Sequence, residues 1–190
     1  MKNTNDKRRS QFPGKLVFLI FVNLFIIKIC NAQSITNQLS DKDTRIFIER
    51  TEGLIKGYFD NLTTIGQLEI ADKDIFIGNL IQSSFENEKV RVVNDIDLTK
   101  STPLDFDIKT YLNNISLFYS SSDVVFELKQ MSLSNIFYST DFYYIKAEVV
   151  REMTIRFQQQ KKVDTTTLEI YVKVIPDKLN PRIYSIKKQL

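Results

Sequence analysis

The spacing of apolar residues changes along this chain, and that change limits the folds open to it. Across much of residues 44–118, apolar side chains recur at three- and four-residue steps, as they do on one face of a helix. From residue 123 onward they alternate, as they do on one face of a strand. Helices followed by a run of antiparallel strands predict an α+β domain, with N-terminal helices packed on a curved antiparallel sheet.

The same spacing sets the expected elements. Helices are predicted at 44–65, 72–85 and 108–118, and strands at 89–98, 123–133, 143–157, 168–174 and 183–186. Asp105 or Asp107 can cap the third helix. A slip in the apolar alternation near Gln130 predicts a β-bulge.

The N-terminus has the composition of a secretory signal peptide. Basic residues precede an apolar run at 16–27, and Ala32 is a small residue suited to cleavage before Gln33. The run is shorter than the roughly 20 residues of a membrane-spanning helix. We therefore expect cleavage near Ala32 and a secreted or periplasmic protein. The alternative is that residues 16–29 stay uncleaved as a short membrane anchor.

This interpretation divides the chain into three parts. They are a signal peptide (1–32), a flexible leader (33–43) and a single α+β domain (44–190). The only cysteine, Cys30, falls within the signal peptide, so the remainder can form no disulfide and offers no thiol.

Composition excludes several classes of function. The chain contains no histidine, which excludes Ser-His-Asp and Cys-His catalysis and histidine-ligated zinc. The net charge of +3 comes from the basic N-terminus, so the remainder is slightly acidic with interspersed signs, and nucleic-acid binding is not expected. Paired aspartates at 72/74 and 105/107 lack the glycine and distal glutamate of a calcium loop. We expect neither a metal nor a cofactor.

Three stretches carry a resemblance to a known family. They are LIKGYFDNL (54–62) in the first helix, VRVVNDIDL (90–98) in the next strand, and the strand set at 123–186. With this order of elements the chain resembles the nuclear transport factor two-like domains, the cone-shaped relatives of the cystatin fold, of the type exported by Gram-negative bacteria. The resemblance implies a conical cavity. That family includes enzymes, such as ketosteroid isomerase, and binding modules, so the fold does not choose between them.

Arg151 is the main candidate for a ligand-binding residue. It lies on the apolar face of the long strand, between Val149 and Met153, where a guanidinium must find acceptors or water. We predict that it lines the cavity and binds an anionic group with Tyr143, and Tyr111 is a third candidate. The alternatives are a bulge that turns Arg151 outward and a side chain that extends to the rim.

Asp95 and Asp97 form the other notable pair. Residues two apart in a strand project from the same side. Because Val90, Val92 and Ile96 are expected to face the core, the alternation directs both aspartates to solvent or to a strand end. No catalytic residue is assigned.

The leading hypothesis is a non-catalytic binding or assembly module with an apolar cavity. Its partner is an unknown protein or small molecule, and homodimerisation stays open. The alternative is a small isomerase or dehydratase that uses aspartate and tyrosine as acid and base. A third hypothesis, an anchored periplasmic assembly protein, requires that residues 16–29 are retained.

Overall fold

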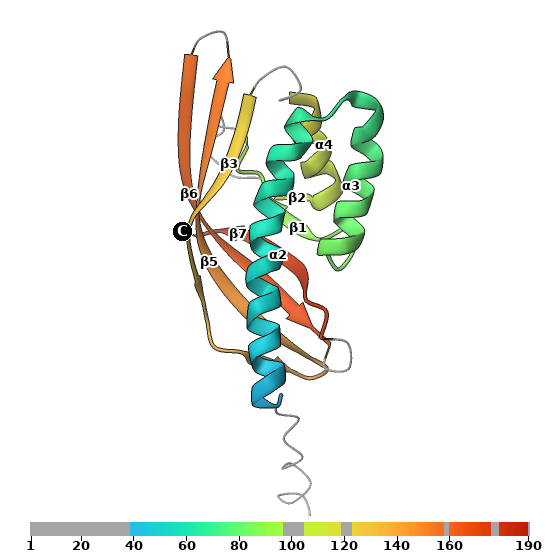
Figure 1. Ribbon diagram of the computed structural model, residues 1–190, viewed down its shortest axis with the longest axis vertical. Coiled ribbons are helices and arrows are strands. Elements are labelled where there is room, and N and C mark those ends of the chain that lie inside the picture. The colour runs from blue at the N-terminus through green and yellow to red at the C-terminus, as the bar shows by residue number, and fades with distance from the viewer. Residues whose placement is uncertain (1–38, 97–104, 119–122, 158–159, 176–178, 190) are drawn as a thin grey trace, which may run out of the picture. The chain divides into compact units, whose positions relative to one another are not determined.

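Three helices supply one layer of the structure (Figure 1). The computed structural model describes residues 39–96, 105–118, 123–157, 160–175 and 179–189. The predicted signal peptide and residues 33–38 of the leader therefore lie outside the described residues. The helices are α2 (Asp41–Gln67), α3 (Ile70–Ser84) and α4 (Ile108–Phe118).

Capping residues set where two of these helices begin. Helix α2 starts three residues before the predicted position, because Ser40 acts as N-cap and accepts a hydrogen bond from the backbone N–H of Asp43 at 3.1 Å. Asp107 caps α4, as predicted, by accepting from the backbone N–H of Thr110 at 2.8 Å. The predicted apolar face of α2 is buried.

The sheet is mixed and mostly antiparallel. Its strands are β1 (Arg91–Val93), β2 (Asp105–Asp107), β3 (Asp123–Leu133), β4 (Phe137–Ser139), β5 (Phe142–Phe157), β6 (Gln160–Val174) and β7 (Arg182–Lys188). Their order is β2-β1-β7-β6-β5-β3, and β4 pairs with β5. Only the β1–β7 pair is parallel among the described strands.

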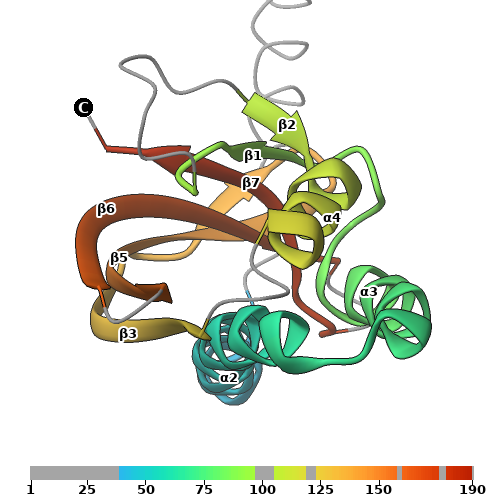
Figure 2. The same cartoon turned by 90° about the horizontal axis from the view of Figure 1, so that it is seen from above.

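The predicted fold class is confirmed. Seen from above, the sheet curls from β3 round to β2, and the three helices stand on the open side of the curve (Figure 2). The core between the layers is apolar and includes Phe47, Ile55, Leu112, Val149 and Ile170.

Several strand boundaries differ from the prediction. The expected strand at 89–98 is reduced to Arg91–Val93, and β6 begins at Gln160, well before the expected 168. The short strands β2 and β4 were not predicted. The β-bulge is confirmed, because the register of β3 against β5 shifts between Leu128 and Gln130.

Helix α2 also covers part of the free edge of β3. The hydroxyl of Thr63 accepts a hydrogen bond from the backbone N–H of Phe126 at 2.9 Å and lies 3.3 Å from the carbonyl oxygen of the same residue. The edge groups of β3 at Phe126 are therefore satisfied within the domain.

Candidate functional site

Arg151 lies at the centre of a buried ionic network. Its side chain is fully buried, on the face of β5 that also carries Val149 and Met153. Strand β5 stays in register here, because Arg151 pairs with Leu128 of β3 and Thr166 of β6. No bulge turns the guanidinium outward, so it points into the core as the alternation predicts.

Two carboxylates contact this guanidinium. Nη2 lies 3.0 Å from Oδ2 of Asp95 and 3.2 Å from Oδ2 of Asp164. The hydroxyl of Tyr111 donates to Oδ1 of Asp95 at 2.7 Å, and the hydroxyl of Thr166 donates to Asp164 at 2.9 Å. These groups come from α4, from the segment after β1, and from β5 and β6. The network therefore joins the helical layer to the sheet.

The position of Asp95 corrects a prediction. Its side chain is only 3% exposed, whereas the alternation directed it to solvent. Strand β1 ends at Val93, and the backbone N–H of Asp95 donates to the carbonyl of Val93 at 3.0 Å. This tight turn breaks the period of two and turns the carboxylate inward. Asp97 lies outside the described residues.

Burial and charge act together on the titrating groups of the network. Burial, followed by the charge of Asp95, raises the pKa of Tyr111 and of Tyr58 well above their ordinary value. Burial alone would lower the pKa of Arg151, but Asp95, Tyr111 and Asp164 more than offset this and leave the pKa raised. The arginine is therefore charged, and both tyrosines are neutral at physiological pH.

The network leaves two arginine donors free. Nε and Nη1 of Arg151 are buried and have no hydrogen-bond partner within the described part of the chain. Two carboxylates already face this one cation, so a further anion would meet net negative charge. A neutral acceptor such as water, a carbonyl or a hydroxyl suits these donors better. This electrostatic balance argues against the anionic ligand that the sequence suggested.

The three predicted ligand-binding residues do not lie together. Arg151 and Tyr111 share Asp95 as a partner. Tyr143, near the start of β5, instead packs against Tyr138 of β4, with ring centroids 4.9 Å apart. The described residues contain no cluster of three potential metal ligands.

A second feature lies on the face of the sheet turned away from the core. Five aromatic residues form a continuous row of ring contacts there, which we call the outer aromatic strip: Phe137, Tyr144, Phe142, Tyr184 and Tyr171. Successive ring centroids in that order are 5.2, 6.3, 6.2 and 5.8 Å apart. Phe137 is 45% exposed, and the other four are partly exposed.

Charged side chains border this strip. Nζ of Lys173 lies 4.8 Å from the ring centroid of Phe142, and Nζ of Lys187 lies 5.3 Å from that of Tyr171. The hydroxyl of Tyr171 donates to Glu169 at 2.8 Å, and this bond, followed by the one from Lys146, lowers the pKa of Glu169. The strip is thus an apolar surface framed by ionised groups.

From the sequence, Tyr144 and Tyr171 are interpreted as core or cross-strand residues, with an aromatic platform for a carbohydrate or an apolar ligand as the alternative, so the strip itself was not predicted. The signal was present, because Tyr144 and Tyr171 alternate with the buried Ile145 and Ile170 and must face the other side of the sheet. The contribution of Tyr184 could not be anticipated, since a register shift between Tyr171 and Val172 places it beside Tyr171.

Together these features define an α+β domain with helices on the inner side of a curved, mostly antiparallel sheet. No protein-family model and no curated protein matches the chain. The chain is similar to solved structures that include a nuclear transport factor 2-like superfamily protein from Salmonella enterica, at 11% identity and a TM-score of 0.48, covering 76% of this chain and 90% of that one.

Two further similar structures are a periplasmic fragment and an intermembrane space region. A periplasmic fragment of TraM shares 15% identity at a TM-score of 0.47, covering 80% of this chain and 98% of the fragment. The intermembrane space region of the chloroplast protein ARC6 shares 9% identity at a TM-score of 0.47, covering 74% and 94%. The described residues contain no helix that is long and apolar enough to cross a membrane.

Proposed function

We propose that this chain is an exported, non-catalytic module that binds a peptide segment of a partner protein on the outer aromatic strip. The observation that supports this is the strip itself, five contacting rings on the solvent side of a sheet. Aromatic side chains dominate the energetics of protein interfaces, and a contiguous exposed apolar surface marks an interaction site.

The edges of the sheet are less suited to a partner than its face. Thr63 occupies the backbone groups of β3 at Phe126, and Lys129 lies beside the bulge that follows. At the other edge, β2 is only three residues long. Addition of a partner strand is therefore hindered at Phe126 of β3 and limited by the short length of β2.

The enzyme alternative depends on an enclosed carboxylate, and Asp95 provides one. Oδ1 of Asp95 already accepts a hydrogen bond from Tyr111, and Oδ2 lies 3.0 Å from Nη2 of Arg151, so this carboxylate is engaged within the protein. The network acts mainly as a structural link under this proposal. Turnover in a screen for isomerase, dehydratase and hydrolase activity, lost on Asp95→Asn, would replace the binding function by a catalytic one.

A soluble random hexapeptide library with free ends tests the binding function directly. We expect wild-type protein to retain a subset of peptides and the Tyr144→Ser variant to lose them. Val163→Ser is the matched control, because Val163 is a 47% exposed apolar residue of β6 outside the strip. Equal retention by wild type and Tyr144→Ser would show that the strip is not the binding surface.

Export is proposed from the sequence of the first 32 residues. Mass spectrometry of the protein released by a Gram-negative host should find an N-terminus at Gln33. A full-length, membrane-bound product would favour the anchored alternative.

A further inference from the structure

A small pocket adjoins the outer aromatic strip. It has a volume of about 300 Å³ and is lined by Glu86, Lys173, Ile175, Asn180 and Arg182. One cross-strand row leads into it, because Phe137 pairs with Tyr144, Tyr144 with Lys173, and Lys173 with Arg182. The strip and the pocket are therefore parts of one surface that crosses four strands.

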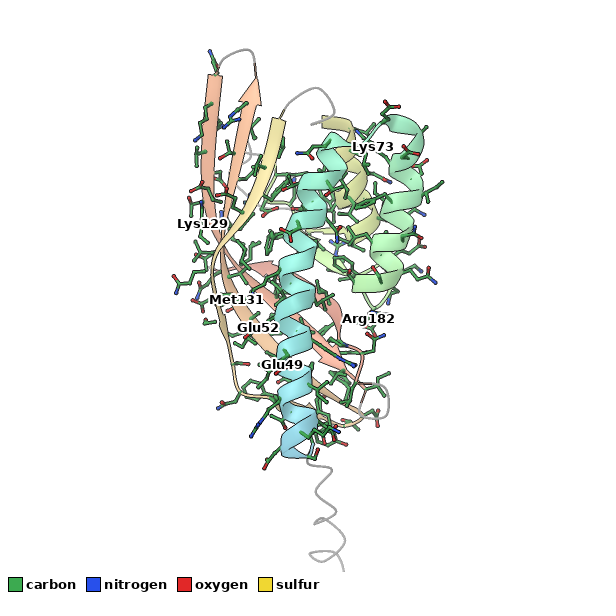
Figure 3. All side chains as sticks on the ribbon, in the orientation of Figure 1. Glu49, Glu52, Lys73, Lys129, Met131 and Arg182 are labelled. Atoms are coloured by element: carbon green, nitrogen blue, oxygen red, sulfur yellow. The ribbon has the colours of Figure 1, made fainter. Side chains whose placement is uncertain are left out.

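The pocket carries an excess of positive charge. Lys173 is ion-paired with Glu86, and this pair leaves the charge of Arg182 uncompensated within the lining. Figure 3 shows Arg182 below α3, where its Nη1 donates to the carbonyl of Ser83 and lies 3.4 Å from Oδ1 of Asn180. Its other guanidinium nitrogens meet no acceptor among the residues described. One cation with free donors suits a ligand with a single negative charge.

The wall of the pocket is held in place by α2. Leu179, next to Asn180, has a φ of 43°, in the left-handed region that residues other than glycine seldom adopt. Its backbone N–H donates to the carbonyl of Ile175 at 3.2 Å, and its own carbonyl accepts from Nη1 of Arg50 at 2.7 Å. Strained backbone that the surrounding structure fixes is typical of ligand-binding segments.

We infer that this pocket binds the C-terminal carboxylate of the peptide whose preceding residues lie on the outer aromatic strip, an inference that rests on the proposed function. The guanidinium nitrogens of Arg182 that meet no acceptor among the described residues form a planar fork that matches a carboxylate, and the neighbouring Lys173–Glu86 pair leaves the net charge of the lining at one positive unit. Ile175, 46% exposed, contacts the apolar side chain of the terminal residue. The amide of Asn180 hydrogen-bonds the last peptide group.

The size and position of the pocket favour the end of a peptide chain. A pocket of this volume accommodates one small terminal residue, and the aromatic strip extends beyond it to receive the rest of the chain.

The test uses the hexapeptide library in two forms, one with free C-terminal carboxylates and one with C-terminal amides. For the peptides that wild-type protein retains, we expect amidation to weaken binding by about tenfold to a hundredfold, because it removes a charge-assisted contact. Arg182→Gln should weaken binding of the free acids by a similar factor and leave binding of the amides unchanged. Arg182→Lys should restore part of the loss.

Arg156→Gln is the matched control, because Arg156 is an exposed arginine near the opposite end of β5. Circular dichroism should show that Arg182→Gln is folded, and the comparison of acids with amides on wild-type protein needs no variant. Equal affinity for acids and amides, with binding lost on Tyr144→Ser, would overturn the inference and leave the proposed function standing. No retention of either library would overturn both.

Discussion

Replacing Asp95 by asparagine should destabilise the domain far more than the same change at Asp164. Both carboxylates approach Nη2 of Arg151, but the side chain of Asp95 is 3% exposed and that of Asp164 is 31% exposed. Removing one partner from a buried ion pair costs about 3–5 kcal/mol, since the remaining charge stays buried. A partly exposed pair is worth about 1 kcal/mol or less.

We therefore expect Asp95→Asn to lower the free energy of unfolding by about 3 kcal/mol and Asp164→Asn by about 1 kcal/mol. Urea unfolding followed by circular dichroism measures both changes. Equal slopes of the free energy of unfolding against urea concentration in wild type and variants would show that the unfolded states are comparable. The chain lacks tryptophan, so tyrosine fluorescence provides the second probe.

A double variant separates the charge from the packing. Arg151→Met combined with Asp95→Leu removes both buried charges, and we expect it to be more stable than Asp95→Asn alone. Two results would contradict this expectation: a stability cost of Asp95→Asn no greater than that of Asp164→Asn, and a double variant less stable than Asp95→Asn. Either result would show that the Asp95–Arg151 ion pair does not stabilise the domain as its burial and its 3.0 Å distance indicate.

Three further predictions concern single contacts. Thr63→Val removes the hydroxyl that contacts Phe126, so it should cost about 1–3 kcal/mol in urea unfolding; an unchanged midpoint would contradict the role of this contact. Asp107→Ala removes the cap of α4 and should cost about 1 kcal/mol at neutral pH. Because the hydrogen bond from the Thr110 backbone lowers the pKa of Asp107, this contribution is present above about pH 4 and is lost as the pH falls, so wild type and variant should converge in acid. Burial raises the pKa of Tyr58 and Tyr111, so these hydroxyls lose their protons at lower pH in the unfolded state than in the folded state. The free energy of unfolding should therefore fall as the pH rises above about 10. An ultraviolet titration in which all eight tyrosines ionise together in the folded protein would refute this.

Periodicity predicted the helices and the long strands well, because a long segment repeats its signal many times. Helix α2 begins three residues earlier than predicted, where Ser40 caps the chain before the first apolar residue, and it ends two residues later, at Gln67. The parity of β5 also placed Arg151 correctly on the core side.

The partners of Arg151 could not be predicted in the same way. Asp95 follows a strand of three residues, and a turn at Asn94 and Asp95 reverses the expected orientation. Asparagine and aspartate favour turns, so the sequence held a signal that outweighed alternation. The pocket is different, because Glu86 and Arg182 are distant in sequence and meet where Phe85 forms a bridge with Ile183 and the backbone N–H of Glu86 donates to the carbonyl of Ile183 at 3.0 Å.

The place of β7 in the sheet has a consequence for how the domain assembles. Strand β7 lies between β1 and β6 in the sheet. It therefore joins β1, which follows α2 and α3 in the chain, to the hairpin of β5 and β6. A growing or translocating chain cannot complete its hydrogen-bonded layer until this segment is available, so every fragment that stops short of residue 182 lacks the bridge between its two halves. Such long-range closure slows folding.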